Sequence, residues 1–410
     1  MNRAIGLICV SFGSFLLACS STGGSGSPLQ GGGSTAGNGG GGGFGNFGNG
    51  GSGAIINVDG GGGGGNLPAN CASGPNDDSD GDGYTFATGD CNDCDANANP
   101  GAYDVPGNGV DEDCNNTPDD TSASCDQLIT DVATANPQDA ARAMGLCNFT
   151  NPGEKAWGVL EAKYVRADGT PGINDVSHGM LTGFGPNVAP QEGTRLLALS
   201  SGTARQPSDP GYSSPGGFDS GTTGFAPAGF PKDSSACPGV STSSDKTTYN
   251  PVGLELKIRV PTNAMSFKYL FNFYTFEFPV FVCDIYNDFF IALQNPAPPN
   301  AVDSNISFDT QGNPVSVNNG FLEVCSAQNA GGKNFPCALG SGQLQGTGFE
   351  DHAATGWLET VSPVTPGSEI TLRFAIWDMG DEILDSTVLI DKFQFSAEEA
   401  TGSSTTPVPR

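Results

Sequence analysis

Apolar and polar residues alternate along several short stretches in the second half of the chain. Every second residue is apolar from Leu254 to Val260, and the stretch from Met265 to Phe276 is rich in aromatic residues, which occupy every second position from Phe267 to Phe273. A period of two gathers the apolar side chains on one face of a strand, where they can be buried. The residues predicted to face a core are Leu254, Leu256, Ile258 and Val260 in the first stretch and Phe267, Tyr269, Phe271 and Phe273 in the second.

Residues 288–293, 370–377 and 388–395 continue this pattern, and clusters of Pro, Gly and Asn separate the stretches. Many short strands without intervening helices are typical of an antiparallel β-sandwich. We therefore predict a mainly β, jelly-roll-like sandwich domain over residues 121–400. A short helical pair is expected at its start, because Cys125–Ala135 has helical periodicity and Asn136 can cap a second helix with Pro137 at N1 and Asp139 at N3.

The N-terminus carries an export pattern instead of a core element. Met1–Arg3 supplies a positive charge, and an uncharged apolar run follows to Ala18, directly before Cys19. The sequence Leu16-Leu17-Ala18-Cys19 resembles a bacterial lipobox, which implies cleavage of a signal peptide over 1–18 and lipidation of Cys19. Ser20 after the lipidated cysteine implies sorting to the outer membrane, where the lipid would be the membrane contact. The alternative is an ordinary signal peptide with an accidental cysteine.

Two segments beside the predicted domains have little apolar content. Residues 19–66 are rich in Gly with Ser and Asn, so they cannot bury enough apolar surface to offset the entropy of ordering. We predict a disordered tether there, with a reach of about 40 Å from roughly 5–6 Å times the square root of residue number. Residues 401–410 are expected to be a loose tail without a sorting motif.

Cysteine usage agrees with export. The chain has 12 cysteines, and ten remain once Cys9 of the leader and the anchor Cys19 are set aside. An even number behind an export signal predicts disulfides, with free buried thiols as the alternative. The predicted pairs are Cys125/Cys147, Cys325/Cys337 and Cys237/Cys283, whereas the connectivity of Cys71, Cys91, Cys94 and Cys114 stays open. The formal net charge of −28 excludes nucleic acid as a partner and favours cation binding.

The segment 67–120 carries the most specific chemistry. Asp78, Asp80 and Asp82 alternate with small residues, and Gly83 follows them. Calcium needs six to eight oxygen ligands, which such a loop can supply, but the twelfth position of an EF-hand would be Gly89 instead of Glu. The missing oxygens could come from Asp90, Asp93 and Asp95, or from Asp111 and Asp113. The alternative is an acidic disordered linker, which is disfavoured because ion binding and disulfides can order a segment that has no packed core. The full predicted ligand set is Asp78, Asp80, Asp82, Asp90, Asp93, Asp95, Asp111 and Asp113.

A second acidic loop precedes the last predicted strand of the sandwich. It contains Asp378, Asp381 and Asp385, which could hold a second cation. The alternative is a solvated acidic turn.

The acidic segment resembles the MopE-type metal-binding motif over about 45 residues. The resemblance rests on the runs 78–84, 90–93, 99–102 and 108–114. Such motifs are common in secreted proteins of myxobacteria and their relatives, and the family name implies copper. Copper prefers imidazole and sulfur donors, and this segment has no His and no Met, so its own chemistry indicates calcium.

Most of residues 150–396 resembles the choice-of-anchor L domain. The matching stretches are Trp157–Glu161, Phe271–Pro279, Tyr286–Leu293, Asn313–Asn319, Ile370–Asp378 and Asp385–Asp391. The resemblance implies surface display, with no established catalytic activity and no known ligand. Family members often carry a C-terminal sorting signal, and the tail here shows none.

Little in the sequence favours an enzyme. His178 and His352 are the two histidines, and no nucleophile motif accompanies them. Glu277 and Asp288 could form a glycosidase pair, although internal pairing or cation binding by carboxylates beside aromatic strands is favoured. Trp157, Trp357 and Trp377 could stack on sugars, but core packing is expected for at least two of them.

Taken together, these patterns predict a non-enzymatic lipoprotein of the outer membrane that displays a sandwich for adhesion or for binding a ligand such as a glycan. Its acidic module would bind structural calcium. The alternatives are a copper-scavenging lipoprotein, in which the acidic motif is itself the function, and a cryptic glycan hydrolase.

Overall fold

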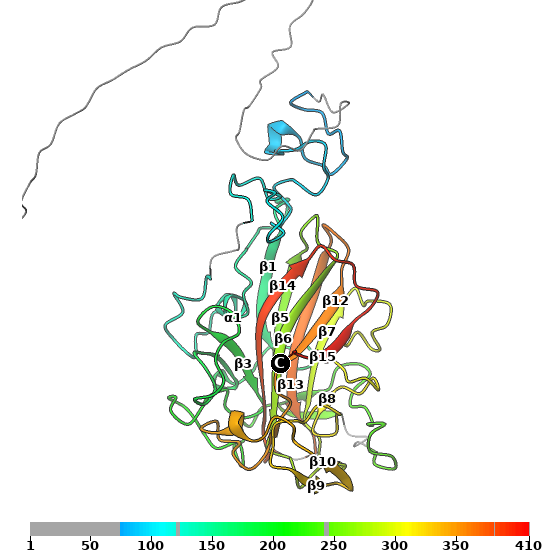
Figure 1. The fold of residues 1–410 in the computed structure, drawn as a ribbon. Helices are drawn as coiled ribbons and strands as arrows, with labels where there is room; N and C mark the ends of the chain where they lie inside the picture. Colours follow the sequence, from blue (N-terminus) through cyan, green and yellow to red (C-terminus); the bar gives the residue numbers. More distant parts are fainter. Residues whose placement is uncertain (1–73, 120–123, 242–245, 381, 410) are drawn as a thin grey trace, which may run out of the picture. The chain divides into compact units, whose positions relative to one another are not determined.

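Strands dominate the described part of the chain, which in this computed structural model comprises residues 74–119, 124–241, 246–380 and 382–409. Two antiparallel sheets face each other in a sandwich (Figure 1), which confirms the predicted fold class. The first sheet has the order β1, β5, β13, β7, β8, with β4 beside β5. Its strands are β1 (Gly158–Val165), β4 (Thr223–Phe225), β5 (Thr247–Arg259), β7 (Phe289–Asn295), β8 (Val315–Ser316) and β13 (Glu369–Asp378).

The second sheet has the order β15, β12, β6, β14, β3, β2, with the short β11 beside β6. Its strands are β2 (His178–Leu181), β3 (Leu196–Ser200), β6 (Ser266–Thr275), β11 (Ala353–Ala354), β12 (Leu358–Pro363), β14 (Ser386–Ser396) and β15 (Ser404–Pro407). A separate hairpin pairs β9 (Gln328–Ala330) with β10 (Lys333–Phe335). The helical elements are α1 (Pro137–Ala143) and the 3-10 turns Phe86–Thr88, Asp175–Ser177 and Gly342–Leu344.

The core lies between the two sheets, where the alternating pattern placed it. Leu254, Leu256 and Ile258 of β5 are fully buried, as are all four aromatic residues predicted to face inward on β6. The rings of Tyr269 on β6 and Phe374 on β13 meet edge to face at 5.0 Å between centroids. This contact joins one sheet to the other, so the period-two pattern reported the inner faces correctly.

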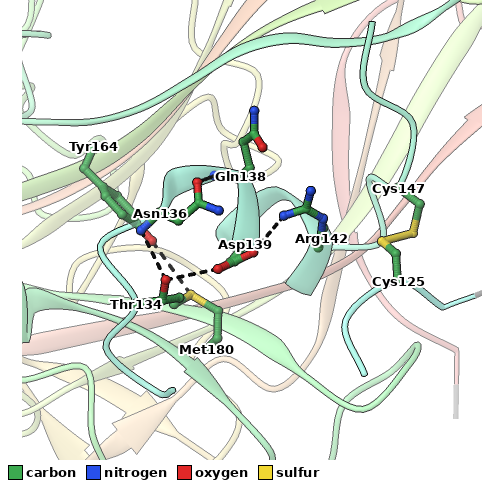
Figure 2. A network of polar contacts seen from close by, with 9 residues as sticks. All are labelled: Cys125, Thr134, Asn136, Gln138, Asp139, Arg142, Cys147, Tyr164 and Met180. Carbon is green, nitrogen blue, oxygen red and sulfur yellow. Dashed lines mark hydrogen bonds and ion pairs between the residues drawn. A yellow bond between two sulfur atoms is a disulfide. The ribbon is translucent and has the colours of Figure 1, made fainter. Parts of the chain in front are cut away.

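The short helix α1 begins as predicted. The side chain of Asn136 accepts a hydrogen bond from the backbone N–H of Gln138, and Pro137 occupies the first turn. Asp139 accepts from the hydroxyl of Thr134 at 3.0 Å and pairs with Arg142 at 2.7 Å, as Figure 2 shows. The acid near the start and the arginine near the end both suit the helix dipole.

The predicted first helix over Cys125–Ala135 does not form, which is a correction. These residues make turns, because polar side chains bind nearby backbone groups: Asp131 accepts from the N–H of Ala133, and Thr134 from that of Asn136. The carbonyl of Val132 accepts from the N–H of Met180, so it cannot serve a helix. Local side-chain bonds and a long-range backbone bond together outweigh the helical periodicity.

The C-terminal segment was also predicted wrongly, since it is not a loose tail. Residues 404–407 form β15, which pairs with β12 at the edge of the second sheet. The hydroxyls of Thr405 and Thr360 lie 2.9 Å apart, and the N–H of Ser403 donates to Asn300. β-Branched threonines suit an edge strand even in a short polar stretch.

Three predicted disulfides are present: Cys125–Cys147, seen in Figure 2, Cys237–Cys283 and Cys325–Cys337. Among the pairs left open, Cys91 bonds Cys114, and Cys94 is also disulfide-bonded. The leader, Cys19, the tether and Cys71 lie outside the described residues. Within the described ranges, no helix has the length and apolar character needed to span a membrane.

Candidate metal centre

The loop from Asp78 to Tyr84 is shaped by its own carboxylates. Asp78 accepts from the N–H groups of Gly81 and Gly83, at 2.7 and 3.0 Å, and Asp82 accepts from that of Tyr84 at 2.7 Å. Gly81 and Gly83 have φ of 83° and 91°, which an L side chain would resist. The glycines therefore let the chain curl tightly enough for alternate aspartates to point the same way.

Three carboxylates converge where this loop meets Asp90. Asp80, Asp82 and Asp90 each offer an oxygen, and these atoms lie within 4.8 Å of one another. In each of the three, Oδ1 accepts a backbone N–H two residues ahead, whereas Oδ2 is buried without a hydrogen-bond partner in the described structure. Buried carboxylate oxygens without partners are rare in proteins and require an explanation. A cation bound between them supplies one.

The electrostatics of the three aspartates agree with this interpretation. Burial, together with the nearby charges of Asp82, Asp80 and Asp93, raises the pKa of Asp90 to about 6, although the hydrogen bond from the N–H of Asn92 lowers it in part. Burial also raises the pKa of Asp82, with the charges of Asp80 and Asp78 adding to the effect. Like charges brought together in a buried place disfavour ionisation unless a positive charge offsets them.

Other predicted ligands lie close by, and one does not. Asp78 and Asp93 form a group with Asp80 whose offered oxygens also lie within 4.8 Å of one another. Asp95 belongs to none of the carboxylate groups found in the described residues. Its Oδ1 instead accepts from the backbone and side-chain nitrogens of Asn97, so it stabilises a turn.

Asp111 and Asp113 form a separate group with Asp104, a residue that was not predicted. Asp104 is buried, and its Oδ1 accepts from the N–H groups of Glu112 and Asp113 at 2.9 and 3.1 Å. It stands alone in Ala-Tyr-Asp-Val, so no local spacing marked it as a ligand. The Cys91–Cys114 bond ties this region to that of Asp90 across 23 residues of chain.

Every donor in these groups is oxygen. The segment has no His or Met, and Cys91, Cys94 and Cys114 are disulfide-bonded and offer no thiolate. Carboxylate oxygens suit hard cations such as calcium, while copper favours nitrogen and sulfur. The donor set therefore fits calcium and does not fit copper.

The acidic module contacts the sandwich at the turn between β5 and β6. Thr262 donates its N–H to the carbonyl of Gly101 and its hydroxyl to Asn99, both at 2.9 Å. Asn263 accepts from the N–H of Tyr103 at 3.1 Å and donates to its carbonyl at 2.8 Å. Asn99 also lowers the pKa of Asp82, so this contact lies beside the carboxylate group.

A cleft of about 640 Å³ lies beside this contact. Asp104 and Asp113 line it from the module, and Arg142, Trp157 and Phe395 line it from the other side. The rings of Trp157 and Phe395 meet edge to face at 5.7 Å. Aromatic rings beside acidic and basic groups are the kind of surface that can hold a polar ligand.

The other candidate residues are the acids of the second predicted cation loop and the tryptophans. Asp378 and Asp385 are 1 % and 0 % exposed, so for these two a solvated acidic turn is wrong. Asp381 lies outside the described residues. Trp377 is fully buried. Trp357 is partly buried and packs against a second apolar cluster that includes Phe184, Tyr274 and Phe349. These two tryptophans therefore pack as predicted.

Glu277 and Asp288 are also buried, at 2 % and 0 % exposed, and neither lines the cleft. Glu277 accepts the backbone N–H of Asp288 at 3.0 Å. The ring of His178 lies tilted against that of Tyr164, with 3.9 Å between centroids, and its Nε2 lies 3.1 Å from the carbonyl oxygen of Thr134. None of these side chains has the access to solvent that a hydrolytic pair requires.

Comparison with known families gives one match. The model of the choice-of-anchor L domain matches residues 174–396, which is more than half of the 410-residue chain and includes every strand from β2 to β14. Such domains occur on cell-surface proteins and point to a non-catalytic, surface-associated role. The acidic module lies outside the matched range. No curated protein and no solved structure matches the chain.

Proposed function

The chain belongs to the choice-of-anchor L family, and we propose that it is a non-enzymatic surface lipoprotein whose acidic module binds calcium and whose sandwich is displayed for adhesion or ligand binding. The observation that carries the calcium proposal is the group formed by Asp80, Asp82 and Asp90. Each has an Oδ2 that is buried without a hydrogen-bond partner, and the three carboxylates converge. Calcium would offset most of the negative charge of the three carboxylates and would give each unpartnered oxygen a ligand bond.

Calcium binding is tested by melting the purified mature chain with chelator, with calcium and with copper. Calcium at a hundred times its Kd would stabilise the folded protein by about 2.7 kcal/mol, so the Tm should rise by several degrees. Copper should not reproduce the rise. Tight copper binding with no change in Tm would instead favour a metal-scavenging lipoprotein.

A ligand role for the sandwich is supported by the cleft beside the module. Trp157 offers a partly exposed ring there, and Asp104 and Asp113 would place a bound cation at the cleft wall. Glycans bind to such surfaces by stacking on aromatic rings and by coordinating cations through hydroxyls. We assign the cleft as the glycan-binding surface.

A glycan array tests this assignment with matched variants. Trp157→Ala should lose binding, whereas Phe225→Ala, which removes a ring that is 65 % exposed on β4, should keep it. Removal of calcium should weaken binding by the wild-type protein. Silence of the wild-type protein across a glycan array and a cell-binding assay would refute the adhesion proposal.

Attachment through Cys19 follows from the lipobox resemblance. Cys19→Ala should abolish lipidation and leave the protein soluble or unprocessed. Recovery of a mature-length variant in the outer-membrane fraction would contradict this mode of anchoring. A cryptic hydrolase is disfavoured by the burial of Glu277 and Asp288, and polysaccharide turnover that Glu277→Gln abolishes would revive it.

A further inference from the structure

Acidic and amide side chains gather at one end of the sandwich, where the core between the sheets stops being apolar. We call this group the strand-end cluster, and all its members are at most 2 % exposed. They come from the loop after β6, the start of β7, the end of β13 and the start of β14. The members are Glu277, Asn287, Asp288, Asp378, Asp385 and Ser386.

Strand register brings two of the acids together. Trp377 of β13 pairs with Phe289 of β7, so one further step along the register places Asp378 opposite Asp288. Ile376 and Phe290 belong to the core between the sheets, and alternate residues share a face. Asp378 and Asp288 therefore continue the inner face, with Cα atoms about 5 Å apart as in other cross-strand pairs.

The opposite sheet contributes polar groups to the same place. Ser201 follows β3 and donates its hydroxyl to Oδ2 of Asp288 at 3.2 Å, which links one sheet to the other. Ser386 begins β14, and its N–H donates to the hydroxyl of Ser201 at 2.9 Å. The hydroxyl of Ser386 is itself buried without a hydrogen-bond partner among the described residues.

Two further side chains of the cluster, Asp385 and Asn287, are buried with polar atoms that have no hydrogen-bond partner among the described residues. Neither oxygen of Asp385 and neither side-chain atom of Asn287 has a hydrogen-bond partner in the described structure, although both residues are 0 % exposed. Asp385 lies against Gly202, where a Cβ would come within 2.3 Å of its Oδ2. Burial and the charge of Asp288 raise the pKa of Asp385 to about 9, and the backbone of Phe218 offsets this only in part.

We propose that the strand-end cluster is a second divalent-cation site, of the calcium class, which holds the two sheets together through Asp288, Asp378 and Asp385. A buried carboxylate with no hydrogen-bond partner on either oxygen, as in Asp385, is costly to ionise, and a bound cation would offset that cost. The donors are all oxygens, as calcium prefers. Three carboxylate oxygens do not gather here within 4.8 Å as they do in the module, so the oxygens of Asn287, Ser201 and Ser386 would complete the set.

Bound calcium can be counted in the full mature chain after dialysis against calcium. Asp385→Asn should carry one calcium ion fewer than wild type and should lose part of the calcium-dependent rise in Tm. Asp391→Asn is the matched control on the same strand. Asp391 is equally buried, but its carboxylate accepts N–H bonds from Gln191, Glu192 and Lys392, so its variant should keep the wild-type calcium content.

The site can also be tested without changing a ligand, in case Asp385→Asn does not fold. Trp377 adjoins Asp378, and the described part of the module contains no Trp. An Asp90→Asn, Trp157→Phe background weakens the module's own site and removes the tryptophan beside Asp104 and Asp113. In that background, terbium emission excited through tryptophan should fall several-fold on Trp377→Phe. Unchanged emission in that variant, or a wild-type calcium content in folded Asp385→Asn, would overturn the proposal while leaving the module's calcium site intact.

Discussion

In the calcium-free protein, the carboxylate of Asp90 opposes folding of the module. Burial and neighbouring aspartates raise its pKa from 3.8 to about 6, a shift of about 2 units that corresponds to at most about 3 kcal/mol. Water at the edge of the module reduces this figure. Because the pKa in the folded state lies above that in the unfolded state, stability of the calcium-free protein should fall as pH rises from about 4 to about 6 and stay low at pH 7.

The variant Asp90→Asn removes the charge and keeps the acceptor that holds the N–H of Asn92 at 2.8 Å. We therefore expect opposite effects in two conditions. With chelator at pH 7, the variant should be more stable than wild type by up to about 3 kcal/mol, and the difference should vanish below pH 4. With calcium, wild type should gain stability and the variant should gain far less, because one of three converging carboxylates is missing.

Calorimetric melting with chelator and with calcium, across this pH range, measures both effects. Asp95→Asn is the control, since Asp95 lies in the same module but outside the carboxylate groups found in the described residues. It should leave the calcium-dependent rise in Tm unchanged. The reasoning is refuted if Asp90→Asn destabilises the calcium-free protein, or if it retains the full calcium response.

Three further predictions concern the module and the core. Replacing Cys91 and Cys114 together by Ser should destabilise the module by about 3 kcal/mol and lower its calcium affinity, as measured by calorimetric titration. Asn263→Ala removes both hydrogen bonds to Tyr103, so limited proteolysis should cut the segment between module and sandwich faster than in wild type. Phe271→Ala should cost about 3–5 kcal/mol in chemical denaturation, because this fully buried ring packs against the facing sheet.

The strands could be predicted because their information is local. On β6 the aromatic residues at every second position from Phe267 to Phe273 join the core between the sheets, whereas Tyr274 packs in a different cluster. On β5 the alternating residues Leu254, Leu256 and Ile258 join the same core. The period alone reports which face is inward, whatever the partner strand is. β15 was missed because its polar Thr residues show no such period, and only its pairing with β12 makes it a strand. The prediction of a helix over 125–135 was wrong for a related reason. The carbonyl of Val132 accepts the N–H of Met180, a residue far along the chain that the local pattern does not report.

The gathering of carboxylates in the module was partly predictable for the same reason. Asp78, Asp80 and Asp82 alternate within one loop, so backbone geometry alone brings their carboxylates together. Asp104 was not found, because it reaches Asp111 and Asp113 only through the fold of the module. Asp95 is close in sequence to the other aspartates, but it does not join their carboxylate groups, because its Oδ1 accepts the backbone N–H of Asn97.

The strand-end cluster shows where sequence reasoning reaches its limit. Asp288 and Asp378 are separated by 90 positions, and they become neighbours only because Trp377 and Phe289 pair in register. A slip of β13 by one residue against β7 would turn Asp378 to the other face of the sheet from Asp288, and the two acids would no longer be neighbours. The sequence shows that acids lie at the ends of these strands. The strand register determines whether their side chains are exposed to water or buried together. Burial of Asp385 with neither oxygen hydrogen-bonded in the described structure favours the cation, and the same side chain is therefore where calcium counting is most informative.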